Sequence, residues 1–359
     1  MSEKVDKAEK AEKVEKTEKV EKKKSIGKKE FSIDTLKNKF SAKTKYKETQ
    51  YFDCGEAFHK ACGLPGPVTC GISMFLGHSN SSKTTALIKA AADAQKKGQL
   101  PVFIITERKW SFDHAKELGF QCEKNADGEW EGFFFFRDDF DYIEQITDYM
   151  NELLTLQEKG ELPHSLAFFW DSVGSVPCKM TFEGKGGKMH NASALADKIG
   201  LGISGRIAKS KKEDYPYENS LVIVNQPWVD LPDNPFGQPE IKAKGGEAIW
   251  LASTLVFLFG NQKKSGISHI MATKDKRKIG FGIRTKVSVL KNHVNGLGYK
   301  DGRIVAVPHG YIEDTPEAVD LYKKQYSDFW KEKLGISGGA DFSLEEEEGN
   351  DFQIFGGTE

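Results

Sequence analysis

The sequence lacks the usual marks of a zinc protein, a disulfide-stapled protein and a membrane protein. Its five cysteines are dispersed and none forms a Cys-x-x-Cys pair, so neither a zinc site nor a disulfide framework is indicated. No stretch approaches the roughly 20 consecutive apolar residues of a membrane span. The N-terminus is charged rather than apolar, which is unlike a secretory signal. We therefore expect a soluble, cytoplasmic protein with free thiols and no membrane partner.

Net charge is also nearly absent, but the charges are unevenly distributed. The 359 residues carry a formal net charge of −1. Residues 1–30 hold 11 Lys and 8 acidic residues, whereas residues 338–359 hold 7 acidic residues and no Lys or Arg. The body between them is mildly basic, which is compatible with binding a polyanion. The acidic tail either competes for the same surface or only aids solubility.

Composition divides the chain into five segments. Residues 1–30 repeat Glu-Lys-x with a period of three, and so polar a segment is expected to be disordered. Residues 31–50 predict a short helix with apolar Phe31, Ile33, Leu36 and Phe40, which we expect to contact a neighbouring subunit. Residues 51–300 predict the core, 301–337 a small C-terminal region with a helix over Pro316–Leu334, and 338–359 an acidic disordered tail.

The core alternates between strand and helix patterns. Apolar runs predict strands at Ile72–Leu76, Pro101–Thr106, Phe133–Phe136, Leu166–Trp170, Ser220–Asn225, Leu255–Phe259 and Lys286–Lys291. Other patterns predict helices at Thr84–Lys97, Phe112–Leu118, Tyr142–Lys159 and Ala192–Lys209, and a turn and helix start at Gly246–Thr254. Strands that alternate with helices predict an α/β fold with a mostly parallel sheet covered on both faces.

A Gly/Ser-rich loop between the first core strand and its helix carries the strongest chemical signal. Backbone N–H groups at a helix N-terminus can hold a phosphate chain, a Lys can reach the β- and γ-phosphates, and a hydroxyl can hold Mg²⁺. The phosphate-binding candidates are Gly77, His78, Ser79, Asn80, Ser81, Ser82, Lys83, Thr84 and Thr85. We expect Lys83 to be the phosphate lysine and Thr84 to be the magnesium ligand. Ser82 occupies the position before the Lys, where this loop pattern has Gly.

Two carboxylates follow apolar strands. Asp171 ends the run Leu166–Trp170, where a carboxylate would hold Mg²⁺ through water. Glu107 follows Val102–Thr106 and could orient or deprotonate a water facing the γ-phosphate. The spacing alone leaves open a second interpretation, in which Glu107 only pairs with Arg108 or Lys109.

These motifs and their order resemble those of the RecA recombinase family, including its phage members. The resemblance runs from about Tyr51 to Asn295. The matching segments are Gly63–Gly66, Ser79–Thr85, Phe103–Glu107 with Phe112-Asp113, Phe168–Val173, Val222–Gln226, Phe236–Glu240 with Gly245-Gly246, and Arg284–Lys286 with Val289–His293. The family fold implied is a RecA-like P-loop ATPase core with a short N-terminal polymerisation segment and charged, disordered termini.

The resemblance implies roles for single residues. Glu107 would activate water, Lys83 would act on the phosphates, and Gln226 would couple the γ-phosphate to the DNA-holding loop Pro227–Lys244. Lys291 would reach a neighbouring subunit's ATP together with His293, which stands where the family usually has a second lysine. His114 lies near the position of an adenine-stacking aromatic residue.

Two Gly-rich segments are the predicted DNA-binding loops. Long loops between firm strands often carry function, lysines neutralise phosphates and aromatic rings stack on bases. The first is Cys178–Met189 and the second follows Gln226. The candidate DNA contacts are Lys185, Lys188, Trp228, Phe236, Lys242 and Lys244.

The function that the resemblance implies is a DNA-dependent ATPase using ATP and Mg²⁺. It would form helical filaments of its own copies on single-stranded DNA, pair them with double-stranded DNA, and exchange strands in recombination and repair. The acidic tail would screen the DNA surface and recruit single-strand-binding or mediator proteins. The chain after Asn295 is too short for the family's usual C-terminal DNA-gathering domain. Two alternatives remain: a RecA-fold ATP-binding filament or scaffold protein with little hydrolysis, and a hexameric replicative helicase.

Overall fold

The computed structural model describes residues 33–41, 44–230, 240–261, 267–274 and 277–333. The chain divides into two compact units, Met1–Lys45 and Tyr46–Glu359. In the first unit the described helix is α2 (Ile33–Phe40), which agrees with the short helix predicted for residues 31–50. Its contact with a neighbouring subunit stays a prediction. The predicted disorder of residues 1–30 and 338–359 falls outside the described residues.

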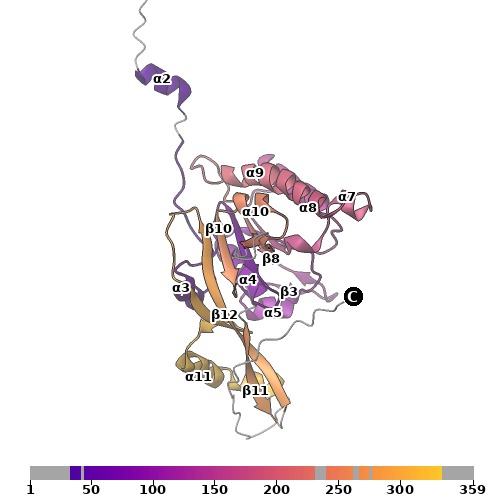
Figure 1. The fold of residues 1–359 in the computed structure, drawn as a ribbon, viewed down its shortest axis with the longest axis vertical. Helices are drawn as coiled ribbons and strands as arrows, with labels where there is room; N and C mark the ends of the chain where they lie inside the picture. Colours follow the sequence, from indigo (N-terminus) through magenta and orange to yellow (C-terminus); the bar gives the residue numbers. More distant parts are fainter. Residues whose placement is uncertain (1–32, 42–43, 231–239, 262–266, 275–276, 334–359) are drawn as a thin grey trace, which may run out of the picture. The chain divides into compact units, whose positions relative to one another are not determined.

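A ten-stranded sheet organises the second unit (Figure 1). Its strand order is β14-β13-β12-β10-β1-β7-β6-β2-β5, with β11 paired to β12. The strands from β10 to β5 in this order run parallel. Their bounds are β10 (Leu255–Phe259), β1 (Ile72–Gly77), β7 (Ser220–Asn225), β6 (Leu166–Asp171), β2 (Leu100–Ile105) and β5 (Phe135–Arg137). The mostly parallel core predicted from the strand and helix patterns is therefore confirmed.

Antiparallel strands extend one side of this sheet. They are β11 (Ser268–Lys274), β12 (Arg277–Asn292), β13 (Gly302–Val307) and β14 (Gly310–Glu313). The predicted strand Lys286–Lys291 is thus the last part of a much longer strand, and residues 302–313 add two strands that the patterns did not indicate. Two small ribbons lie off the main sheet: β3 (Glu123–Lys124) with β4 (Trp130–Glu131), and β8 (Pro227–Asp230) with β9 (Glu240–Ala243).

Helices cover both faces of the parallel strands. Residues of β1 alternate between two cores: Phe75 packs in one, whereas Met74 and Leu76 pack in the other. The first core includes α3 (Glu56–Cys62), α4 (Lys83–Lys96) and α5 (Phe112–Glu117), and the second includes α6 (Ile143–Glu158) and α10 (Glu247–Ala252). Strands buried on both faces explain the uninterrupted apolar runs in the sequence.

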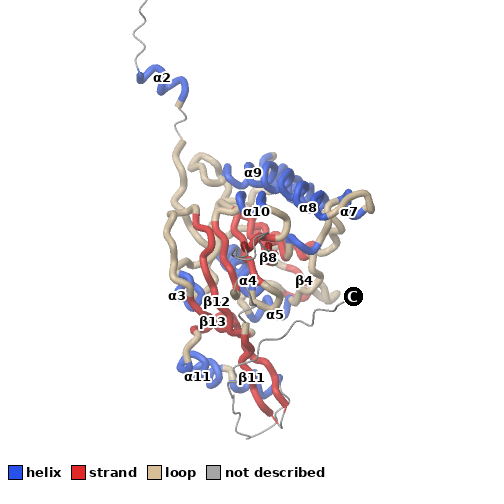
Figure 2. The backbone as a smooth tube through the Cα atoms, viewed as in Figure 1, coloured by secondary structure: helices blue, strands red, loops and turns tan. Residues whose placement is uncertain are grey.

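The predicted helix Ala192–Lys209 is longer and less regular than expected. It comprises α8 (Lys188–Leu195), the π-helical segment η2 (Ala196–Ile203) and α9 (Ser204–Lys209), which form one continuous rod (Figure 2). Helix α8 and the short α7 (Lys179–Phe182) also occupy both ends of the segment expected to be the loop Cys178–Met189. Part of that loop is therefore helical.

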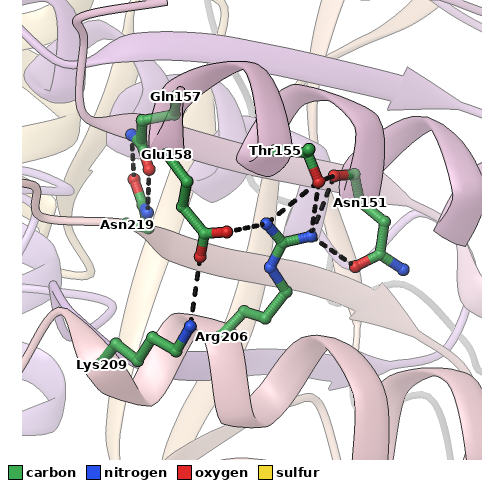
Figure 3. Close-up of polar contacts among 7 residues, drawn as sticks. All are labelled: Asn151, Thr155, Gln157, Glu158, Arg206, Lys209 and Asn219. Carbon is green, nitrogen blue, oxygen red and sulfur yellow. Dashed lines mark hydrogen bonds and ion pairs between the residues drawn. The ribbon is translucent and has the colours of Figure 1, made fainter. Parts of the chain in front are cut away.

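Arg206 clamps this rod onto α6 (Figure 3). Its guanidinium donates to the Asn151 carbonyl oxygen (2.9 Å) and to Thr155 Oγ1 (3.2 Å). It also pairs with Glu158 at 2.9 Å. Lys209 reaches the other Glu158 oxygen at 3.2 Å. The rod that follows the first predicted DNA loop is thus fixed to the body by charged hydrogen bonds.

Replacing Arg206 by Met should lower the free energy of unfolding by about 2 kcal/mol, because a half-buried set of charged hydrogen bonds is lost while the aliphatic stem remains. Chemical denaturation would measure this. Lys185→Ala is the matched control: Lys185 makes an exposed pair with Glu183 at 2.8 Å, and its loss should change stability by less than about 0.5 kcal/mol. Equal effects of the two changes would contradict the clamp.

The C-terminal described part builds a small third core. Residues of the β11–β12 hairpin and of β13 pack on α11 (Pro316–Gln325) and α12 (Ser327–Lys333). The core residues are Ile270, Phe281, Val305, Val307, Val319, Tyr322 and Trp330. The helix predicted over Pro316–Leu334 is broken at Tyr326, which has φ −110° and ψ 23°. In the described ranges, no helix has the length and apolarity that a membrane crossing needs.

Candidate nucleotide site

The candidate site lies at the carboxyl-terminal edge of the parallel strands, between β1 and α4. In the strand register Leu76 pairs with Asn225, and Ile105 pairs with Asp171. Glu107 follows β2, Asp171 ends β6, and Gln226 follows β7. The sheet therefore brings the loop at 77–82 and all three predicted catalytic or metal residues to one edge, which is where open α/β sheets bind ligands.

The loop is folded around its own lysine. Lys83 Nζ donates to the His78 carbonyl oxygen (2.6 Å) and to Ser81 Oγ (3.2 Å). Gly77 fits closely, since a Cβ there would lie 2.6 Å from the Phe259 carbonyl oxygen. His78 Nε2 and Ser82 Oγ are buried without a hydrogen-bond partner in the described structure. A concave loop with a buried ammonium and unpaired polar atoms fits an anionic group such as a phosphate chain.

Ser82 adopts the left-handed backbone conformation, with φ 67° and ψ 19°. Gly enters this region freely, whereas a residue with a Cβ does so at a cost of about 1 kcal/mol. The irregularity that the sequence shows at Ser82 is thus a backbone strain at the start of α4, where Asn80 also has a positive φ of 60°.

Ser82→Gly should therefore raise the free energy of unfolding of the nucleotide-free protein by about 1–2 kcal/mol, since it relieves φ strain and removes an unpaired buried hydroxyl. Denaturant titration is the measurement. Ser79→Gly is the control, because Ser79 is exposed and its φ is not positive. The strain account fails if Ser82→Gly is no more stable than Ser79→Gly.

Burial lowers the pKa of the Lys83 amine. Only 7% of the side chain is exposed. Desolvation lowers the pKa of Lys83 from 10.5 to about 8, although the nearby carboxylates of Asp171 and Glu107 oppose the shift. A bound anion would stabilise the charged form of this amine.

Thr84 and Asp171 form the second part of the site. Thr84 Oγ1 donates to Asp171 Oδ2 at 2.7 Å. Burial raises the pKa of Asp171 to about 6, against the effect of the Thr84 hydrogen bond. A hydroxyl and a buried carboxylate at one point are oxygen ligands of the kind that Mg²⁺ prefers, so these residues fit the predicted metal.

Glu107 lies beside this pair. Its Oε1 accepts a hydrogen bond from Ser172 Oγ at 2.7 Å. Arg108, one of the two cations in the alternative interpretation, instead approaches Asp141 at 3.8 Å. Ser172 thus bonds the Glu107 carboxylate, a contact that the sequence motif did not reveal because any residue can follow a strand-end Asp.

Gln226 connects the site to the second predicted DNA loop. Its side-chain oxygen accepts from Lys244 Nζ at 2.6 Å, and its carbonyl oxygen accepts from the Lys244 amide at 3.1 Å. The loop leaves and returns as the ribbon β8–β9, in which Trp228 is opposite Lys242. Phe236 lies outside the described residues, and so do the side chains of Trp228, Lys242 and Lys188.

The first predicted DNA loop exposes more apolar surface than its lysines suggested. Lys185 is exposed next to Glu183, and Met180, Phe182 and Met189 are also exposed, the last to 86%. These apolar side chains are candidate base contacts that the charge pattern did not single out.

The Lys291 side chain is hydrogen-bonded within its own chain in this structure. Its amine donates to the carbonyl oxygens of Trp250 (2.6 Å) and Leu251 (3.1 Å) at the end of α10, and burial lowers its pKa. His293 is exposed just after β12. Their contact with a neighbouring subunit's ATP stays a prediction, and Lys291 would have to exchange these carbonyls for it.

Two features near the loop come from distant parts of the chain. Tyr311 OH donates to the Ser82 carbonyl oxygen at 2.6 Å, across 229 positions of sequence. A cavity of about 530 Å³ lies close by, and Thr85, His114, Pro308, Phe329 and Trp330 are among its lining residues. His114 thus lines a cavity that also borders Thr85, and its contact with a base stays a prediction.

Comparison with known proteins supports a distant relationship. No protein-family model matches the chain. The chain is 25% identical over 263 residues to Protein RecA of Nitratidesulfovibrio vulgaris, covering 73% of this chain and 64% of that protein. It is 25% identical over 238 residues to Protein RecA of Syntrophobacter fumaroxidans, covering 65% and 59%. It is 26% identical over 236 residues to that of Rickettsia canadensis, covering 66% and 59%. The chain thus spans less than two thirds of the length of these curated relatives, and together with the α/β core these similarities indicate a distant RecA-like protein.

Proposed function

We propose that this chain binds ATP with Mg²⁺ at residues 77–85 and acts as a DNA-dependent ATPase that forms filaments on single-stranded DNA and exchanges strands. The observation that carries the proposal is the convergence at one sheet edge of the Lys83 loop, the Thr84–Asp171 pair and Glu107. The distant similarity to RecA proteins supports the DNA-linked part of the activity.

Each part of the site has a distinct task in this proposal. Lys83 and the loop amides hold the phosphates, while the Thr84 hydroxyl and, through water, Asp171 hold Mg²⁺. The metal ion supplies charge neutralisation at the phosphates when it is bound. Glu107 orients a water molecule and accepts its proton, and Ser172 fixes the carboxylate for that step. His114 and the cavity beside Thr85 receive the base.

The DNA-binding part of the proposal rests on the two segments at 178–189 and 227–244. Lysines there neutralise phosphates, and the exposed Phe182 and Met189 contact bases. Gln226 lies between the phosphate loop and the second segment. A γ-phosphate that contacts Gln226 would therefore alter the affinity of that segment for DNA. Lys291 and His293 of a neighbouring subunit would contact the bound ATP. The acidic tail would recruit other proteins, and the protein would act in the cytoplasm.

Electron microscopy tests the assembly. The purified protein is imaged with single-stranded DNA and a slowly hydrolysed ATP analogue, and separately with ADP. Helical filaments that form on DNA in the analogue are the expected result. Six-membered rings would instead support the helicase, and filaments that form equally without DNA would support the scaffold.

A further inference from the structure

Lys244 is bonded to the nucleotide-facing end of β7 through both its backbone and its side chain. Its amide donates to the Gln226 carbonyl oxygen at 3.1 Å, and its ammonium donates to Gln226 Oε1 at 2.6 Å. Its carbonyl oxygen accepts from Asn225 Nδ2 at 2.8 Å. Asn225 is completely buried, so these bonds close the base of the β8–β9 ribbon on a rigid anchor.

The stem of the same lysine lies against the turn that follows β6. A Cβ added at Gly174 would lie 2.9 Å from Lys244 Cδ, and Gly174 belongs to the 3₁₀ turn η1 (Val173–Ser175) that follows Asp171. Lys244 therefore spans from the metal-site strand to the Gln226 strand. A lysine whose only role was to bind a DNA phosphate would not need the contacts with Gly174 and Gln226.

The orientation of the Gln226 carboxamide follows from the Lys244 bond. Because the ammonium donates to Oε1, the amide group keeps its Nε2 hydrogens for another partner. An ionised phosphate oxygen can only accept, so Nε2 is the end of Gln226 that can bind it. The Lys244 bond thus selects the orientation in which Gln226 can contact the γ-phosphate.

Two glycines follow Lys244 and join the ribbon to α10. Gly245 and Gly246 have φ values of 91° and 86°, which glycine adopts without strain. A Cβ on Gly245 would lie 2.5 Å from Leu195 Cδ1 of α8. The turn after Lys244 therefore packs closely against the rod that follows the first predicted DNA loop.

We propose that Lys244 is a positioning residue that holds Gln226 and the base of the β8–β9 ribbon together, so that phosphate contact at Gln226 changes the DNA affinity of the ribbon. This rests on the proposed function and revises the role predicted for Lys244, which was a direct DNA contact. Lys242, two residues earlier on β9, keeps the predicted role of a DNA contact.

The test compares Lys244→Met with Lys242→Met in the full chain. Both remove one positive charge, and Met keeps the stem that packs on Gly174. The affinity for a fluorescent single-stranded DNA is measured at several salt concentrations, once with ATP-γ-S and Mg²⁺ and once without nucleotide. The readout is the gain, meaning the affinity with nucleotide divided by the affinity without it.

Lys244→Met should reduce the gain by about 10-fold, and Lys244→Arg should restore most of it. Lys242→Met should weaken binding in both states, leave the gain unchanged and reduce the salt slope by about 0.7. The proposal is overturned if Lys244→Met behaves like Lys242→Met. A wild type that shows no gain overturns the proposed function itself, and the inference with it.

A double-mutant cycle tests whether Lys244 acts through Gln226. If Lys244 acts through Gln226, Gln226→Leu should reduce the gain at least as far as Lys244→Met does, and the double variant should have the same gain as Gln226→Leu alone. Additive losses would show that Lys244 acts on its own, and would contradict the proposal.

Discussion

Glu107→Gln is expected to lower DNA-stimulated ATP turnover by about 10²–10⁴-fold, the usual contribution of a positioned general base. The change keeps the shape of the side chain and an oxygen that can accept from Ser172 Oγ, which lies 2.7 Å from Oε1. Because the phosphate loop and the Thr84–Asp171 pair are untouched, nucleotide affinity should remain within a few-fold of the wild type. Turnover at saturating ATP and DNA, together with the Kd for ATP, measures both effects.

Two further variants sharpen the assignment of Glu107. Ser172→Ala leaves the carboxylate in place but removes its hydrogen bond, so turnover should fall by about 10-fold. Glu129→Gln changes an exposed glutamate between β3 and β4 and should leave turnover unaltered. Full turnover in Glu107→Gln would show that another group activates the water.

Lys83→Met should weaken ATP binding by roughly 100-fold or more, since a charged hydrogen bond to phosphate contributes about 3 kcal/mol. Its amine already lies within the loop, on the His78 carbonyl oxygen and Ser81 Oγ. Lys96→Met, at the exposed end of the same helix, is the matched control and should keep wild-type affinity. Equal affinity in Lys83→Met would place the nucleotide elsewhere.

The same substitution has a pH signature in the nucleotide-free protein. The pKa of Lys83 is lowered from 10.5 to about 8 on folding, so the cost of keeping the amine charged is fully present below pH 8. Between about pH 8 and 10.5 the unfolded chain binds more protons, and the wild type gains stability as this cost is relieved. The stability difference between wild type and Lys83→Met should therefore shift by about 3 kcal/mol in favour of the wild type across this window. Denaturation at several pH values measures it, and a flat difference would contradict the buried charge.

The parallel core and the phosphate loop could be predicted because their signals are local. An apolar run such as Leu166–Trp170 marks a strand wherever it pairs, and the Gly/Ser loop is a contiguous motif. The structure brings Glu107, Asp171 and Gln226 to the same sheet edge, since the carboxyl ends of parallel strands meet there. Their individual roles stay predictions.

The other features of the fold and of the site could not be predicted, because they depend on contacts between distant parts of the chain. The hydrogen bond from Tyr311 to Ser82 joins residues 229 positions apart, and no spacing rule indicates it. The hairpin β11–β12 carries many charges and glycines, so its apolar pattern is weak even though Phe281 and Ile270 are buried. Lys291 is predicted to reach a neighbouring subunit's ATP, and the sequence gives no sign that its amine binds the end of α10. Helix ends and hairpins use polar residues for local bonding, which hydrophobic periodicity does not report.

Ser82 shows how a departure from a motif gains physical meaning. In the sequence it was a missing glycine, and in the structure it is a non-glycine residue at φ 67° with a buried, unpaired hydroxyl. The loop therefore keeps its shape at a cost in stability.

The most direct test of the central claim is ATP turnover by the purified full chain with Mg²⁺, measured with and without single-stranded DNA. The account predicts that DNA raises the turnover rate, and that Glu107→Gln loses the increase while still binding ATP. A turnover rate that DNA does not change would contradict it.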